Sequence, residues 1–252
     1  MNYADLMTKA ERLRKRLGED GLSPVDIFAL ALNMENLTIV YYPMGDNLSG
    51  MCIKGQEDNN VIAVNSGMTL GRQRFSLAHE FYHLFYDDTM ISLCAKKIDT
   101  GKDTERAADM FASYFLMPEA ALQEIAEKYV KKSKDQQLEL NDVIRIEQYF
   151  GVSHQAAVYR LMHTEYLKSD TGASFLNIAV RRYAEALGYS SDLYKPSPEY
   201  KRYMTYGNYI DQAKHVILKG LVSTGRYEEL LLDAFRPDLV YGDESEDGDV
   251  ID

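Results

Sequence analysis

The stretch His79-Glu80-Phe81-Tyr82-His83 places two imidazoles and a carboxylate inside an otherwise apolar run. On an α-helix, residues i and i+4 lie one turn apart on the same face, so His79 and His83 can direct their rings at one metal ion. Glu80 lies about 100° further round the helix, where it can reach a water on that ion but is poorly placed to bind the ion itself. The pattern predicts a Zn²⁺ centre with Glu80 as the catalytic base. The alternative is a helix that carries two histidines by chance.

The surroundings of this stretch favour the metal interpretation. The flanking residues, 72–78 and 84–86, are mostly apolar and indicate a buried helix, in which unsatisfied histidines would be costly. A second segment, 104–116, also has helical periodicity, and its Glu105 and Asp109 are again spaced i, i+4. We interpret Glu105 as the third metal ligand and Asp109 as the acceptor for the spare N–H of one ligand histidine. A solvated acidic edge on an amphipathic helix is the alternative.

Both segments resemble the ImmA/IrrE metallo-endopeptidases. Residues 72–83 read RQRFSLAHEFYH, where that family typically shows R-F-T-x-A-H-E-x-x-H. Residues 105–118 read ERAADMFASYFLMP, where the family shows E-x-x-A-N-x-F-A-x-x-L-L-M-P. Asp109 replaces the usual Asn, and Tyr114-Phe115 replaces smaller residues. The two motifs together are specific, so the resemblance extends to the arrangement of the site.

The resemblance is strong over residues 60–120 and looser over 20–60 and 135–167. It implies a zinc protease domain that cleaves a partner repressor of the helix-turn-helix type, often encoded beside the protease. Nothing in the sequence of this chain identifies that repressor, so the partner is an implication of the family alone.

Composition is that of a soluble globular protein, with 252 residues, 46% hydrophobic and 27% charged. The amphipathic N-terminus, residues 1–18, lacks the apolar core of a signal peptide, and no apolar run is long enough to cross a bilayer. We therefore expect a cytoplasmic protein with no membrane partner. Cys52 and Cys94 form no Cys-x-x-Cys pair, so we expect them to be small core residues and not zinc ligands.

The net charge of −11 disfavours a nucleic-acid partner, because phosphate contacts need clusters of Lys and Arg. It suits a basic protein partner, such as a DNA-binding domain. Much of the negative charge lies in residues 242–252, which we expect to form a disordered acidic tail.

Periodicity predicts an α+β fold. Helices are expected over 4–18 and from a Ser23-Pro24 start to about Met34. Three β-rich runs then predict a three-stranded sheet, whose edge could bind a substrate backbone by strand addition; these runs are 37–42, 49–54 and 61–64, with a further short strand at 91–95. With the metal helix, 71–86, and the Glu105 helix, this pattern predicts a zincin-like minimal zinc peptidase domain.

The rest of the chain is predicted to be mostly helical. Two helices, 140–150 and 154–167, flank Gly151 in a helix-turn-helix pattern. We favour a hairpin that covers the peptidase over a DNA-recognition pair, because Arg160 is the only Arg or Lys in the second helix. Further helices are expected at 174–187, 206–219 and 224–235. The predicted domains are a peptidase domain at 1–168, a helical region at 169–241 and the acidic tail at 242–252.

Three functions are compatible with these patterns. The first is a zinc endopeptidase that cleaves a regulatory protein, with water activated by the metal and Glu80. The second is a regulatory or antitoxin-type binding protein that keeps the zinc fold without proteolysis, although a pure binder has no use for Glu80. The third is a DNA-binding regulator. Arg72 and Arg74 begin the metal helix, where the helix dipole disfavours cations, so we expect each to have a partner, either an acidic side chain or a substrate carboxylate.

Overall fold

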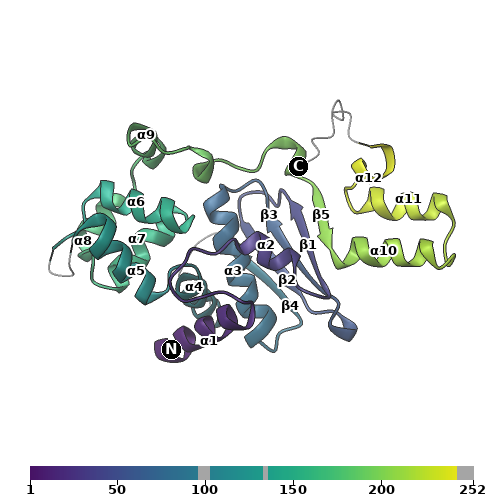
Figure 1. Ribbon diagram of the computed structural model, residues 1–252, viewed down its shortest axis with the longest axis horizontal. Helices are drawn as coiled ribbons and strands as arrows, with labels where there is room; N and C mark the ends of the chain where they lie inside the picture. Colours follow the sequence, from purple (N-terminus) through teal and green to yellow (C-terminus); the bar gives the residue numbers. More distant parts are fainter. Residues whose placement is uncertain (96–102, 133–135, 243–252) are drawn as a thin grey trace.

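The computed structural model describes residues 1–95, 103–132 and 136–242 (Figure 1). Its centre is a mixed five-stranded sheet with the strand order β4-β2-β3-β1-β5. The strands are β1 (Leu37–Tyr42), β2 (Leu48–Ile53), β3 (Asn60–Asn65), β4 (Ile91–Ala95) and β5 (Met204–Gly207). Strands β1 and β3 are parallel, and all other neighbours are antiparallel.

The α+β prediction is confirmed, but the predicted sheet of three strands is too small. Strand β4 extends it on one side and β5 on the other. Strand β5 comes from the region that the sequence predicted as helical, and its four residues are too few to show an alternating pattern. Antiparallel pairing with β1 holds this short segment in the sheet.

In Figure 1, helices lie to the left and to the right of the sheet. Those of the first half are α1 (Tyr3–Arg16), α2 (Ile27–Leu32), α3 (Leu70–Tyr86), α4 (Asp103–Leu116), α5 (Glu119–Ile125), α6 (Leu140–Phe150) and α7 (His154–His163). Those of the C-terminal region are α8 (Ser169–Phe175), α9 (Val180–Ala186), α10 (Asn208–Leu218), α11 (Thr224–Asp233) and α12 (Asp238–Tyr241). Within the described ranges, no helix has the length and apolarity that crossing a membrane requires.

Two predicted helix boundaries are wrong for identifiable reasons. Helix α2 begins after Asp26, whose carboxylate accepts the N–H groups of Phe28 and Ala29, and not after Ser23. The predicted helix 174–187 is two helices, because α8 ends where the carbonyl of Phe175 bonds to the ring of His154, at 3.0 Å. The predicted acidic tail lies outside the described residues except for Gly242.

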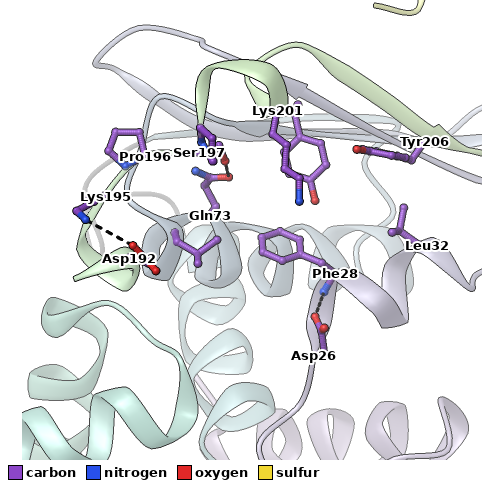
Figure 2. A pocket seen from close by; sticks show the side chains of 13 residues that line it. Asp26, Phe28, Leu32, Gln73, Asp192, Lys195, Pro196, Ser197, Lys201 and Tyr206 are labelled. Atoms are coloured by element: carbon purple, nitrogen blue, oxygen red, sulfur yellow. Dashed lines mark hydrogen bonds and ion pairs between the residues drawn. The ribbon is translucent and has the colours of Figure 1, made fainter. Parts of the chain in front are cut away.

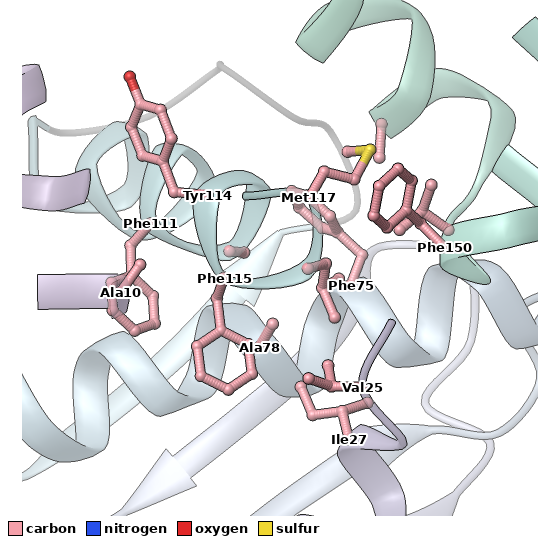
Figure 3. Close-up of a cluster of buried hydrophobic side chains, with 14 of the residues drawn as sticks. Ala10, Val25, Ile27, Phe75, Ala78, Phe111, Tyr114, Phe115, Met117 and Phe150 are labelled. Carbon is pink, nitrogen blue, oxygen red and sulfur yellow. The ribbon is translucent and has the colours of Figure 1, made fainter. Parts of the chain in front are cut away.

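The core forms where α3 packs on the sheet and α4 packs on α3. Phe81 of α3 meets Phe115 of α4 edge to face, with ring centroids 5.8 Å apart, and Phe111 stacks on Phe115. Figure 3 shows side chains of α1, α3 and α4 meeting in this cluster, with Phe150 of α6 at its border. Each fully buried phenylalanine contributes about 1.5–3 kcal/mol. This packing fixes the two helices that carry the metal motif in one relative position.

The first turn of α3 is held by backbone carbonyls. Arg74 donates to the carbonyl oxygens of Gly151 and Val25, and Arg72 donates to the side chain of Gln155 at 3.0 Å. The expectation of an acidic partner is therefore met only weakly, by an Arg74–Asp26 separation of 3.9 Å. These bonds compensate for two cations at a helix N-terminus, since carbonyl groups present partial negative charge to each guanidinium.

The two helices α6 and α7 form a buried hairpin. Arg160 is fully covered; it donates to the carbonyl of Met117 and pairs with Glu119 at 2.8 Å. His154, the first residue of α7, is buried, and its Nδ1 lies 2.6 Å from a carboxylate oxygen of Glu147. The one Arg of α7 is thus buried in contacts within the protein and is not exposed for contact with DNA.

A strap formed by residues 192–201 crosses the start of α3 on its way to β5 (Figure 1). The Ser197 hydroxyl donates to Gln73 at 3.0 Å, and the Leu70 N–H donates to the Lys195 carbonyl at 2.8 Å. Beneath the strap lies a pocket of about 680 Å³, with Phe28 on one side and Tyr206 on the other (Figure 2). The strap therefore ties the C-terminal region to the metal helix.

We expect Gly71→Ala to lower stability. A Cβ at Gly71 would lie 2.8 Å from the backbone nitrogen of Ser153, so the start of α7 would have to move. Overpacking of this kind costs about 1–3 kcal/mol and outweighs the gain in helix propensity. Urea unfolding should show a lower midpoint at an unchanged slope.

The matched control is Gly225→Ala in α11, where a Cβ meets nothing within 4 Å. This substitution should leave the midpoint unchanged or raise it slightly. Equal midpoints for Gly71→Ala and the wild-type protein would contradict the close packing of α3 on α7.

Candidate metal centre

Helix α3 brings His79 and His83 together on one face. Their Nε2 atoms lie 3.2 Å apart, and both side chains are buried. The pair is one helical turn apart, as the i, i+4 spacing requires, and the surrounding apolar residues of α3 face the core. Both Nε2 atoms therefore point to the same place beside the helix.

Glu105 comes from α4 and completes this cluster. Its two carboxylate oxygens lie 3.4 Å from Nε2 of His79 and 3.5 Å from Nε2 of His83. Its side chain is 29% exposed, so the cluster opens to solvent on this side. The hydrogen bond with His79 lowers the pKa of the Glu105 carboxyl, which keeps it ionised.

The three separations fit a tetrahedral metal ion. Zinc binds histidine nitrogen and carboxylate oxygen at about 2.0–2.2 Å, and the ligand atoms of a tetrahedron with such bonds are about 3.3–3.6 Å apart. The observed values of 3.2, 3.4 and 3.5 Å correspond to this spacing. The residues present thus fit a bound cation, and their mixed nitrogen and oxygen donors suit zinc.

Two aspartates orient the histidine rings from outside the cluster. Nδ1 of His79 lies 2.8 Å from Asp109, the carboxylate that the sequence suggested for this place. Nδ1 of His83 lies 2.8 Å from Asp87, a partner that sequence reasoning missed. Its i, i+4 spacing from His83 at the end of α3 was a signal that could have revealed it. With both Nδ1 atoms donating to carboxylates, each Nε2 is left as a free electron pair for a metal.

Glu80 lies beside the cluster and is fully buried. Neither of its carboxylate oxygens has a hydrogen-bond partner among the described residues. Burial raises the pKa of Glu80 to about 7, so this carboxyl can both take up and release a proton near neutrality. A Cβ at Gly50 of β2 would lie 2.7 Å from one of its oxygens, so a larger residue there would displace the Glu80 carboxylate.

Cys94 also belongs to the cluster. Its sulfur lies within 4.8 Å of the ligand atoms of His79, His83 and Glu105, and its side chain is fully buried. The sequence predicted that neither cysteine would lie at the metal, because neither is part of a Cys-x-x-Cys pair. That argument applies to cysteines close in sequence, whereas β4 brings Cys94 to α3 through the sheet. Cys52 and Cys94 are both free thiols.

The comparison with protein families decides the classification. The family described as the IrrE N-terminal-like domain, Peptidase_M78, matches residues 25–162, which is more than half of the chain. The chain belongs to the ImmA/IrrE metallopeptidases. The match spans every residue of the cluster, so the resemblance inferred from the two motifs is confirmed.

No curated protein matched the chain. The family assignment therefore rests on the matched segment and on the clustered side chains. The pocket beneath the strap is lined partly by residues beyond the matched segment, and it includes none of the four clustered residues (Figure 2). The metal chemistry of a metallopeptidase must accordingly be located at the cluster and not in that pocket.

We expect Asp87→Ala to weaken zinc affinity by about 10–100-fold, as removal of a carboxylate behind a ligand histidine typically does. Asp109→Ala should have a similar effect on His79. Competition with a chromophoric chelator measures both. The neighbouring Asp88 is exposed, and Asp88→Ala should bind zinc as the wild-type protein does. Equal affinities for the Asp87 and Asp88 variants would show that the contact with His83 does not support the metal.

Proposed function

We propose that the protein is a zinc-dependent endopeptidase that cleaves a regulatory protein in the cytoplasm. His79, His83 and Glu105 hold the zinc, Asp109 and Asp87 orient the two histidines, and Glu80 is the general base. The observation that carries this proposal is the buried Glu80 carboxylate, which has no hydrogen-bond partner and lies beside three donors spaced for one cation.

Bound zinc supplies a water with a pKa of about 7 and polarises a peptide carbonyl. The Glu80 carboxylate would accept a proton from a water held at His79, His83 and Glu105, and would later donate that proton to the amine released from the cleaved peptide bond. A pKa of about 7 suits both transfers. The missing side chain at Gly50 leaves the space that the Glu80 carboxylate occupies.

The open edge of β4 is the place that we propose for the substrate backbone. Among the described residues, β4 pairs only with β2, so its outer N–H and C=O groups are available to an added strand. Ile91 and Leu93 on this strand are 58% and 61% exposed, whereas the alternate residues, Ser92 and Cys94, point inward. An extended peptide paired here would lie beside the cluster.

For the substrate class we propose a helix-turn-helix repressor. The family resemblance implies such a partner, and the net charge of −11 suits a basic DNA-binding domain. A direct role in DNA binding is less well supported, because Arg160 of the α6–α7 hairpin is buried in contacts with Met117 and Glu119. A binding protein without proteolytic activity is the other candidate, and the experiment below separates it from the enzyme.

We expect Glu80→Gln to retain zinc but to lose about 10²–10⁴-fold in cleavage rate, because glutamine cannot accept the proton. Host cells expressing the wild-type or the variant protein can be compared by mass spectrometry of protein N-termini. New N-termini that depend on Glu80 and fall in a helix-turn-helix regulator would support the proposal.

Two controls define the outcomes. Zinc content, measured by atomic emission, should be equal in the two proteins, and Glu11→Gln on the exposed face of α1 should cleave as the wild type does. If the same regulator co-purifies with both proteins and is never cut, the non-proteolytic binding function is correct and the endopeptidase is not.

A further inference from the structure

Cys94 supplies a fourth donor at the metal cluster. Its sulfur is within 4.8 Å of the three other ligand atoms, and the side chain is fully buried on the inner face of β4. The position of the strand is fixed: Gly50 pairs with Cys94 across the ladder, and the Ser49 hydroxyl donates to the Cys94 carbonyl at 3.2 Å. The thiol is therefore held facing the cluster.

The surroundings of the sulfur include one hydrogen-bond donor for a metal-bound thiolate. The Ser92 hydroxyl lies 3.2 Å from the sulfur, where it can donate a hydrogen bond to a thiolate. Thiolate sulfur is a softer donor than water oxygen and is a common zinc ligand. Glu80 gives an independent indication, since both its oxygens are buried without a hydrogen-bond partner beside the same cluster.

The number of donors matters for function. Catalytic zinc sites keep three protein ligands and one open position for water, whereas sites with four protein ligands are closed and structural. Two imidazoles, one carboxylate and one thiolate make four. With the sulfur bound, no position is left for the water on which Glu80 acts.

We propose that Cys94 is a fourth metal ligand that closes the centre in the resting protein, so that the peptidase is latent until the thiol leaves. This inference rests on the proposed endopeptidase function. We call the bond between the Cys94 sulfur and the metal the latch. When the latch closes, a sulfur–metal bond replaces an oxygen–metal bond, and the thiol proton passes to the released water or to bulk solvent. When the latch opens, water displaces the sulfur and the thiolate takes up a proton. No electron is transferred in either direction.

The latch lies on the same strand that presents an open edge. The exposed Ile91 and Leu93 alternate along β4 with the buried Ser92 and Cys94. A peptide that pairs with the outer edge of β4 therefore acts on the element that holds the sulfur. The proposal therefore places the trigger for release of the thiol at this edge, where pairing with a peptide would shift β4 out of the position that its present contacts give it.

The test uses the 252-residue protein loaded with one Co²⁺ per chain, as wild type, Cys94→Ser and Cys52→Ser. Cys52 is the matched control, because it is also a buried free thiol but is not in the cluster. A thiolate bound to cobalt gives a near-ultraviolet charge-transfer absorption. This band should appear in the wild type and in Cys52→Ser and should be lost in Cys94→Ser.

Zinc affinity is the second measurement. Cys94→Ser should bind zinc about 10–100-fold more weakly than the wild-type protein, which is the loss expected for Asp87→Ala and Asp109→Ala. Its peptidase activity at saturating zinc should exceed that of the wild type, since the fourth position is open. Cys94→Ala serves in the same assays if the serine variant does not fold.

A folded, cobalt-loaded wild type without the band would overturn the latch, and so would a band that persists in both Cys94 variants. These outcomes are separable from failure of the proposed function. If Glu80→Gln cleaves as fast as the wild type while the band depends on Cys94, the thiol is a ligand but the catalytic assignment is wrong.

Discussion

The structure depends on burying the two histidines and the glutamate of α3 without leaving them unsatisfied. Polar groups in an apolar core each cost several kcal/mol unless they find partners. The histidines find them in Asp109, Asp87 and Glu105, of which two come from α4. Only Glu80 keeps two free oxygens. The phenylalanine packing between α3 and α4 therefore offsets the cost of burying the two histidines, because it brings the carboxylates of α4 to the rings of α3.

The same helix is constrained at its other end by elements distant in sequence. Arg74 binds carbonyls of residues 25 and 151, and the strap binds Gln73 and Leu70. The α6–α7 hairpin and the C-terminal region thus help to position α3 and its two histidines, although neither contributes a residue to the cluster. A rigid helix with little freedom at its start holds His79 and His83 within the small tolerance that metal binding requires.

The sheet has a second role beside supporting the helices. Strand β2 gives Glu80 its room through Gly50, and β4 brings both an open edge and a thiol to the cluster. One layer thus contains the space for the base, the surface proposed for the substrate and the proposed latch. The proposed latch would place a fourth metal ligand on the strand that we propose for substrate binding, so that a few residues of β4 would serve both roles.

The sequence by itself determined the local features of this protein. The i, i+4 spacings identified the helix of His79 and His83 and that of Glu105 and Asp109. Short β-rich runs located β1, β2 and β3, because these signals are carried by neighbouring residues. Only the tertiary structure decided which distant residues meet. It brought Cys94 to the cluster and β5 to the edge of β1. Such contacts depend on the packing of whole elements, and no spacing along the chain encodes them.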